Sequence, residues 1–187
     1  IIVFYPKNGV SPIQEKQMVT QKGANTFVVG IHGNFDDAQT GVKKIFSDKE
    51  LAKEMDEKGF QFSSANSINI GRLVPQVVYY VYAYAKLLAN EEIAAGEEIN
   101  VVVPTGNFGN ILAAYFAKKM GLPIRTLICA SNDNKVLYDF FTTGTYDRRR
   151  EFILTNSPSM DILISSNLER LIYLSTGSDP KANAALM

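Results

Sequence analysis

The sequence predicts an α/β protein of three layers, in which open, mainly parallel sheets carry helices on both faces. Short apolar runs bounded by Gly and Pro alternate with longer segments of helical periodicity. Their order up to about residue 63 is β-α-β-α-α-β, which favours parallel strands joined by right-handed crossovers. Three consecutive valines at 101–103 predict a strand that is buried on both faces.

The individual elements follow from these patterns. Ser11 and Pro12 suit the N-cap and first position of the first helix, and Asp36 or Asp37 is expected to cap the second. Pro75 either lies in the first turn of the long helix or kinks it. The strands are predicted at 1–5, 26–31, 60–63, 99–103 and 123–130. The helices are predicted at about 11–21, 37–46, 48–58, 69–90, 110–120, 134–141 and 168–174.

The character of the chain changes near residues 62–66, which predicts two lobes. Residues 1–64 would form a smaller, partial α/β lobe, and residues 65–187 part of a larger one. Because the chain starts at Ile1 inside an apolar run, we expect it to be a piece of a longer protein.

Composition excludes several classes of function. The sequence has 187 residues, and its 19 basic and 19 acidic residues give zero net charge, so neither nucleic acid nor a membrane surface is an expected partner. The apolar runs are too short to cross a bilayer, and no signal peptide is visible. With only Cys129 and His32 as soft ligands we expect no metal site. The lone cysteine also excludes an internal disulfide and suits a reducing, cytoplasmic location. No oligomeric state is indicated.

The main candidate site is the loop that follows the valine strand, Thr-Gly-Asn-Phe-Gly-Asn at residues 105–110. Gly106 and Gly109 permit positive φ and a close approach of the backbone to a ligand. Loop amides and the first amides of the next helix would then form a concave anion site, as for a phosphate. An ordinary strand-to-helix turn is the alternative.

A second candidate site is Asn-Ser-Ile-Asn-Ile-Gly-Arg at residues 66–72, where Arg72 offers a forked, charged donor for phosphate or carboxylate. The alternative is a capping cluster with an arginine on the surface. Two anion sites would suit a phosphorylated cofactor and a phosphorylated substrate. Lys7 and His32 each follow a strand, where Lys7 either neutralises a phosphate or is a plain loop lysine. We expect Arg148–Arg150 to be solvated surface, and the tyrosines at 79–84 to belong to a helix packed on a sheet.

Several of these segments, in this order, resemble the threonine synthases, which are pyridoxal-phosphate enzymes of the tryptophan-synthase-β fold type (fold type II). The resemblance covers essentially the whole chain. The matching segments are Phe-Tyr-Pro-Lys-Asn-Gly-Val-Ser-Pro-Ile-Gln-Glu-Lys-Gln (4–17), Asn-Phe-Asp-Asp (34–37), Ser-Ala-Asn-Ser-Ile-Asn-Ile-Gly-Arg-Leu (64–73), Val-Pro-Thr-Gly-Asn-Phe-Gly-Asn (103–110) and Ser-Ser-Asn-Leu-Glu-Arg (165–170).

The resemblance implies conversion of O-phospho-L-homoserine and water to L-threonine and phosphate, by γ-elimination and β-addition of water. It implies a two-lobe fold in which residues 65–187 belong to the lobe that binds pyridoxal phosphate. The residues implied for the cofactor phosphate are Thr105, Gly106, Asn107, Phe108, Gly109 and Asn110. Those implied for the substrate phosphate are Asn66, Ser67, Arg72 and Lys7, whereas Asn69 would brace the turn. The helix at 165–170 receives no role beyond packing and capping.

Three features of the family are not matched. The lysine that holds the cofactor covalently and the Ser-Gly-Asp-Thr-Gly turn are expected upstream of Ile1, and the group facing the pyridine nitrogen is expected beyond Met187. No lysine of this sequence lies in the cofactor-lysine context. We therefore expect no catalytic residue here and an isolated chain that is inactive.

Two other readings stay open on sequence grounds. One is another enzyme of the same fold type, a serine/threonine dehydratase or a cysteine synthase, which would need no second phosphate site. The other is a non-catalytic α/β module that binds a phosphate or nucleotide, supported by the strand-helix pattern alone.

Overall fold

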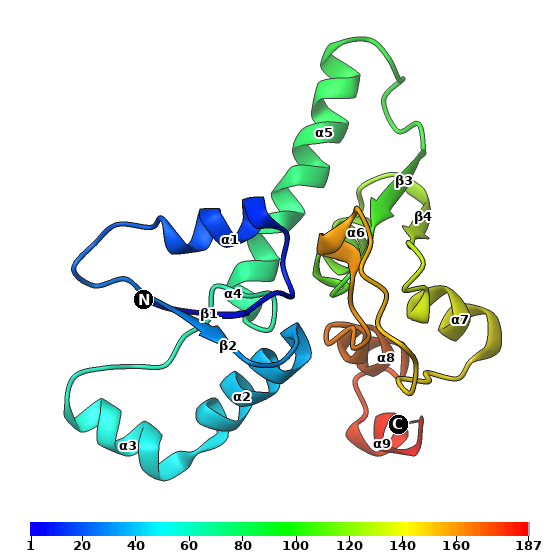
Figure 1. Ribbon diagram of the computed structural model, residues 1–187. Coiled ribbons are helices and arrows are strands. Elements are labelled where there is room, and N and C mark those ends of the chain that lie inside the picture. Colours follow the sequence, from blue (N-terminus) through cyan, green and yellow to red (C-terminus); the bar gives the residue numbers. More distant parts are fainter. Residues whose placement is uncertain (187) are drawn as a thin grey trace. The chain divides into compact units, whose positions relative to one another are not determined.

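The computed structural model describes residues 1–186, which form two compact units that divide after Ser63. The boundary predicted from the sequence, after residue 64, lies one residue later. Each unit contains one two-stranded parallel sheet with helices (Figure 1). Parallel strands joined through helices confirm the α/β prediction. None of the helices in residues 1–186 is both long and apolar enough to cross a membrane.

The first unit is built on strands β1 (Ile2–Pro6) and β2 (Phe27–Ile31), which the helix α1 (Pro12–Val19) connects. Helix α2 (Phe35–Ser47) packs on β1, and α3 (Lys49–Glu57) packs on α2.

The cap of α2 differs from the prediction. Asn34 is the N-cap, and its side chain and that of Asp37 each accept from the other residue's backbone N–H, at 2.9 and 2.8 Å. Asp37 therefore closes a capping box instead of being the cap, and Asp36 lies in the first turn.

The prediction of a strand at residues 60–63 is wrong. These residues form neither helix nor strand. The ring of Phe62 stacks on that of Phe46 in α2 at 5.7 Å. Phe62 thus serves side-chain packing, whereas Phe60 is 62% exposed, so these apolar residues did not indicate a strand.

The second unit is built on β3 (Ile99–Pro104) and β4 (Ile124–Ala130), with α6 (Gly109–Lys119) as the connection. Helix α6 packs on both strands, α5 (Val77–Ala89) packs on α6, and α7 (Val136–Thr143) packs on β4. The core of this unit includes two leucine side chains with no exposed surface, Leu73 and Leu112.

Within this chain β3 is buried on one face only, so the prediction of a strand buried on both faces is wrong. Val103 is 5% exposed, whereas Val102 is 60% exposed. Val102 pairs with Ile128 of β4, which is also exposed. The apolar run indicated a strand correctly but could not indicate what covers each face.

The long predicted helix is divided at Pro75. Helix α4 (Ile70–Leu73) leads into a single 3-10 turn, η1 (Val74–Gln76), and then into α5. Because proline has no N–H to donate, the tighter turn accommodates it.

The remaining elements lie towards the C-terminus. A short 3-10 turn, η2 (Pro158–Met160), precedes α8 (Leu168–Ser175) and α9 (Pro180–Leu186). Helix α9 is not among the helices that the sequence pattern predicts. The polar run 131–134 does not cap α7, whose N-cap is Lys135 without a side-chain bond. Asn134 is buried instead and donates to the Ile153 carbonyl and the Asp161 carboxylate.

We expect Leu112→Ala to lower the free energy of unfolding by about 2–5 kcal/mol, because it removes a fully buried side chain from α6. Urea unfolding measures the change. Leu186→Ala, at a side chain that is 68% exposed, is the matched control and should change little. Equal losses in both variants would contradict the assignment of this core.

Candidate functional site

The loop that follows β3 is held by hydrogen bonds to the sheet and to the first turn of α5. The Thr105 amide donates to the Ala130 carbonyl at 2.9 Å, and the Thr105 hydroxyl donates to the Val103 carbonyl at 2.7 Å. At the other end Tyr80 donates its hydroxyl to the Asn110 carbonyl at 2.8 Å. Burial raises the pKa of Tyr80, so the phenol stays a donor at neutral pH.

The backbone amides of this loop make no hydrogen bond to other described residues. In the described part of the chain, none of the five amides from Gly106 to Asn110 donates a hydrogen bond. Gly106, Phe108 and Gly109 are nevertheless buried. Buried N–H groups are almost always paired, so this run of free donors points to a ligand that accepts hydrogen bonds.

The glycines of the loop serve close packing and not positive φ. A Cβ at Gly106 would lie 2.7 Å from the Ser159 carbonyl oxygen, and one at Gly109 would lie 2.8 Å from the Ser67 Cβ. Phe108 instead takes the left-handed conformation, with φ of 65°. A bulky residue there is strained and is held by burial, since Phe108 is only 3% exposed. Strain of this kind gathers at functional sites.

The second candidate segment packs directly against this loop. The Asn107 side chain donates to the Ser67 hydroxyl at 3.3 Å and makes a long contact of 3.5 Å to Asn66 Oδ1. Asn69 braces the turn as expected: its side chain donates to the Ser64 carbonyl and accepts from the Gly71 amide. The two predicted anion sites therefore adjoin within one unit.

Arg72 is the third residue of the short helix α4 and has an exposed side chain. Among the described residues no hydrogen bond or ion pair engages its guanidinium group, which is thus available to an anion. Lys7 and His32 are exposed at the carboxyl ends of β1 and β2, at one edge of the first unit's sheet. They belong to a different unit from the loop, so Lys7 as a phosphate ligand stays a prediction.

Sequence reasoning missed the third part of the site, which is the start of α8. The Ser165 hydroxyl donates to the Gly106 carbonyl, and the Ser166 amide and hydroxyl donate to Asn107 Oδ1. Asn167, 1% exposed, donates to the Asn107 carbonyl and to the Ser67 hydroxyl. A run of small polar residues before an apolar helix was the available signal, but it reads equally well as a cap.

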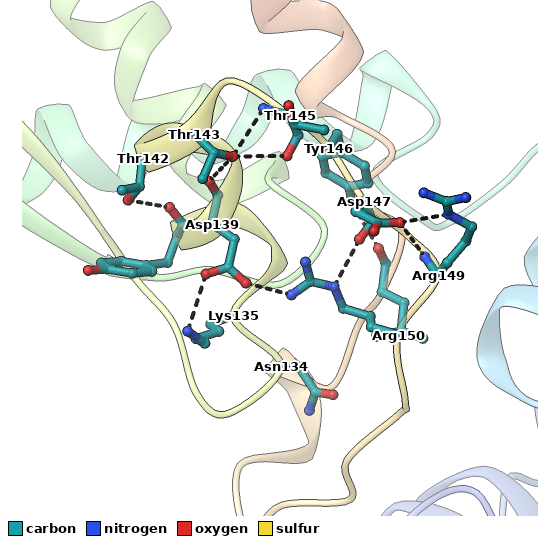
Figure 2. Close-up of polar contacts among 12 residues, drawn as sticks. Asn134, Lys135, Asp139, Thr142, Thr143, Thr145, Tyr146, Asp147, Arg149 and Arg150 are labelled. Carbon is teal, nitrogen blue, oxygen red and sulfur yellow. Dashed lines mark hydrogen bonds and ion pairs between the residues drawn. The ribbon is translucent and has the colours of Figure 1, made fainter.

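The arginine run 148–150 takes part in local ion pairs (Figure 2). Arg150 donates to Asp139 at 2.7 Å and to the Asp147 carbonyl, and Arg149, exposed, pairs with Asp147. The hydrogen bond from Arg150 holds the pKa of Asp139 below its ordinary value, and Lys135 adds to this effect. Arg148 and Arg149 are exposed, as expected. Arg150 is only partly exposed and is paired with Asp139, so the prediction of solvated surface is wrong for this residue.

Neither a metal centre nor a reactive thiol is indicated. No group of three or more potential metal ligands occurs among residues 1–186. Burial raises the pKa of Cys129, so its thiolate is disfavoured.

We expect Arg150→Met to destabilise the protein at pH 7, because Asp139 keeps its charge but loses its main partner. The contribution of a carboxylate with a lowered pKa is present above its unfolded-state pKa and is lost as the pH falls through the folded-state pKa. The difference in unfolding free energy from wild type should thus shrink below about pH 4. Unfolding in urea at several pH values measures it. Arg148→Met, at an exposed arginine, is the control, and a pH-independent Arg150 effect would contradict the argument.

The chain is similar in sequence and in structure to known proteins. No family model matches the chain. Human threonine synthase-like 1 is 50% identical over 181 residues, which are 96% of this chain and 24% of that protein. Threonine synthase of Saccharomyces cerevisiae is 43% identical over 97% of this chain and 35% of its own length.

Solved structures agree. A structure of PLP-bound threonine synthase from Brucella melitensis matches with a TM-score of 0.76 and 44% identity, over 100% of this chain and 37% of that chain. Escherichia coli threonine synthase matches with a TM-score of 0.79 and 34% identity, over 95% of this chain and 39% of that one. In sequence and in fold the chain is thus related to the threonine synthases, and it spans about a quarter to two-fifths of the length of these relatives.

Proposed function

We propose that this chain provides the phosphate-binding part of a pyridoxal-phosphate enzyme that converts O-phospho-L-homoserine and water to L-threonine and phosphate. The observation that carries the proposal is the run of five amides at Gly106–Asn110 that donate no hydrogen bond within the described residues, beside the hydroxyl of Ser67. Arg72, five residues further along the chain from Ser67, has an exposed side chain. The relatedness to threonine synthases supports the choice of reaction.

The loop 105–110 suits a cofactor phosphate. Its free amides are donors, and helix α6 begins at Gly109, where its dipole favours an anion. A side chain at Gly106 or Gly109 would clash with neighbouring residues, so the close packing of the loop backbone requires glycine at both positions. Thr105 stabilises the start of the loop, because its hydroxyl donates a hydrogen bond to the Val103 carbonyl.

The segment 66–72 suits the phosphate of the substrate. Asn66 and Ser67 offer short polar side chains, and Arg72 offers charge and two parallel donors. When pyridoxal phosphate is bound it supplies the electron sink for carbanion chemistry. The task of this chain's residues is to orient the substrate and to stabilise the charge on the phosphate as its bond to Cγ breaks. Water then supplies the oxygen added at Cβ.

The lysine that would hold the cofactor covalently is not among the residues of this chain that match the family. We therefore propose that the 187-residue chain alone is inactive, and the cytoplasmic location expected from the sequence stays a prediction.

We expect Arg72→Ala to raise KM for O-phosphohomoserine by about ten-fold or more, because a charged hydrogen bond to phosphate is lost, with little change in cofactor affinity. Steady-state kinetics and titration with pyridoxal phosphate, in the protein that carries the whole active site, measure both quantities. Arg148→Ala, at an exposed arginine elsewhere in the unit, is the control. Equal losses of substrate and cofactor binding would favour an enzyme without a second phosphate site.

For the isolated chain, incubation with pyridoxal phosphate and borohydride should label no single lysine stoichiometrically, since its lysines lie outside the expected context. Mass spectrometry of the digested protein reads this out. Complete labelling of one lysine would disprove the proposal that this chain lacks the cofactor-binding lysine.

A further inference from the structure

The side chain of Asn167 has only one chemically consistent orientation. Arg170 Nη1 lies 2.5 Å from Asn167 Oδ1, and a guanidinium can only donate. The amide nitrogen of Asn167 therefore faces the other way. It donates to the Asn107 carbonyl at 2.9 Å, which can only accept, and to the Ser67 hydroxyl at 3.0 Å.

The side chain of Asn107 is oriented by the same logic. Its Oδ1 accepts from the Ser166 backbone amide at 2.8 Å, and a backbone N–H can only donate. The Asn107 amide nitrogen is thus turned towards the Ser67 hydroxyl at 3.3 Å.

Ser67 consequently receives two N–H donors on one oxygen. A serine hydroxyl has two acceptor lone pairs and one O–H, so both acceptor positions are occupied and the hydroxyl can only donate further. Among residues 1–186 its only acceptor is Asn66 Oδ1 at 3.4 Å, which already accepts from the Ile68 amide at 3.2 Å. That contact is long for an O–H donor, so the Ser67 hydroxyl makes at most a weak hydrogen bond to Asn66.

Arg170 fixes the position of Ser67 as well as the orientation of Asn167. Its Nη1 donates to the Ser67 carbonyl at 2.9 Å and its Nη2 to the Ile68 carbonyl at 2.7 Å. One half-buried guanidinium thereby holds the turn and the amide that faces it.

We propose that Asn167 and Arg170 are positioning residues that make the Ser67 hydroxyl a dedicated donor to the phosphate of the substrate. The inference rests on the proposed function, because it assumes that the anion at Ser67 is that phosphate. Neither residue needs to touch the substrate, since both act through Ser67.

A double-mutant cycle tests this coupling. Asn167→Asp keeps the shape and the contact to Arg170 but presents an acceptor to Ser67, whose proton then turns away from the ligand. The dissociation constant of inorganic phosphate is measured by 31P NMR in protein saturated with pyridoxal phosphate, so that the loop 106–110 is occupied. We expect Asn167→Asp to weaken binding about ten-fold or more in the wild-type background and less than about two-fold in Ser67→Ala.

The outcomes separate the inference from the proposed function. Equal weakening in both backgrounds would mean that the new charge acts directly on the anion, and the inference would be wrong. Unchanged phosphate binding in both Ser67→Ala and Arg72→Ala would overturn the proposed substrate site and the inference with it. Asn100→Asp, at an exposed position of β3, controls for the added charge.

Arg170 provides an independent arm. Arg170→Met should weaken phosphate binding, and Arg170→Lys should restore part of the affinity because an ammonium group can still donate to Asn167 Oδ1. Arg125→Met, at an exposed ion pair with Glu98, is the matched control. Thermal unfolding of each variant reports stability separately. Loss of stability in Arg170→Met with unchanged phosphate affinity would show a purely structural role.

Discussion

The buried side chain of Asn167 is the constraint on which the candidate site depends. It joins three segments that are far apart in the sequence, at distances of 60 residues to Asn107 and 100 residues to Ser67. All its hydrogen-bonding groups are engaged, and it is 1% exposed. A buried amide left without a partner costs about 1–3 kcal/mol, so the three segments are held in one arrangement.

The packing beneath this network explains how polar segments come so close together. Gly109 has no side chain, so the Ser67 side chain can lie against its backbone. Behind it, α6 presents Leu112 and Ala113, neither with exposed surface, to the core. The apolar residues of α6 supply the stability, and the strained conformation of Phe108 is carried by that stability.

Local pattern predicted much of the fold because period and turn residues are properties of a few neighbouring positions. The strands at 99–103 and 123–130, the loop at 105–110 and the break at Pro75 were accessible in this way. The bond between Asn167 and Ser67 was not, because nothing near Asn167 in the sequence specifies a partner 100 residues away. The exposure of Val102 and the packing of Phe62 depend on what covers a surface, which periodicity does not record.

The sheet of the second unit has a chemical consequence beyond its role as a support. In the part of the chain that the structure describes, β3 and β4 pair only with each other. Each therefore has an outer edge that pairs with no further strand of the described residues, and the side chains of Val102 and Ile128 are exposed. Such edges are templates for intermolecular β-addition. Handled alone at high concentration, the chain should self-associate through this sheet, whereas a neighbouring strand from any larger assembly would suppress it.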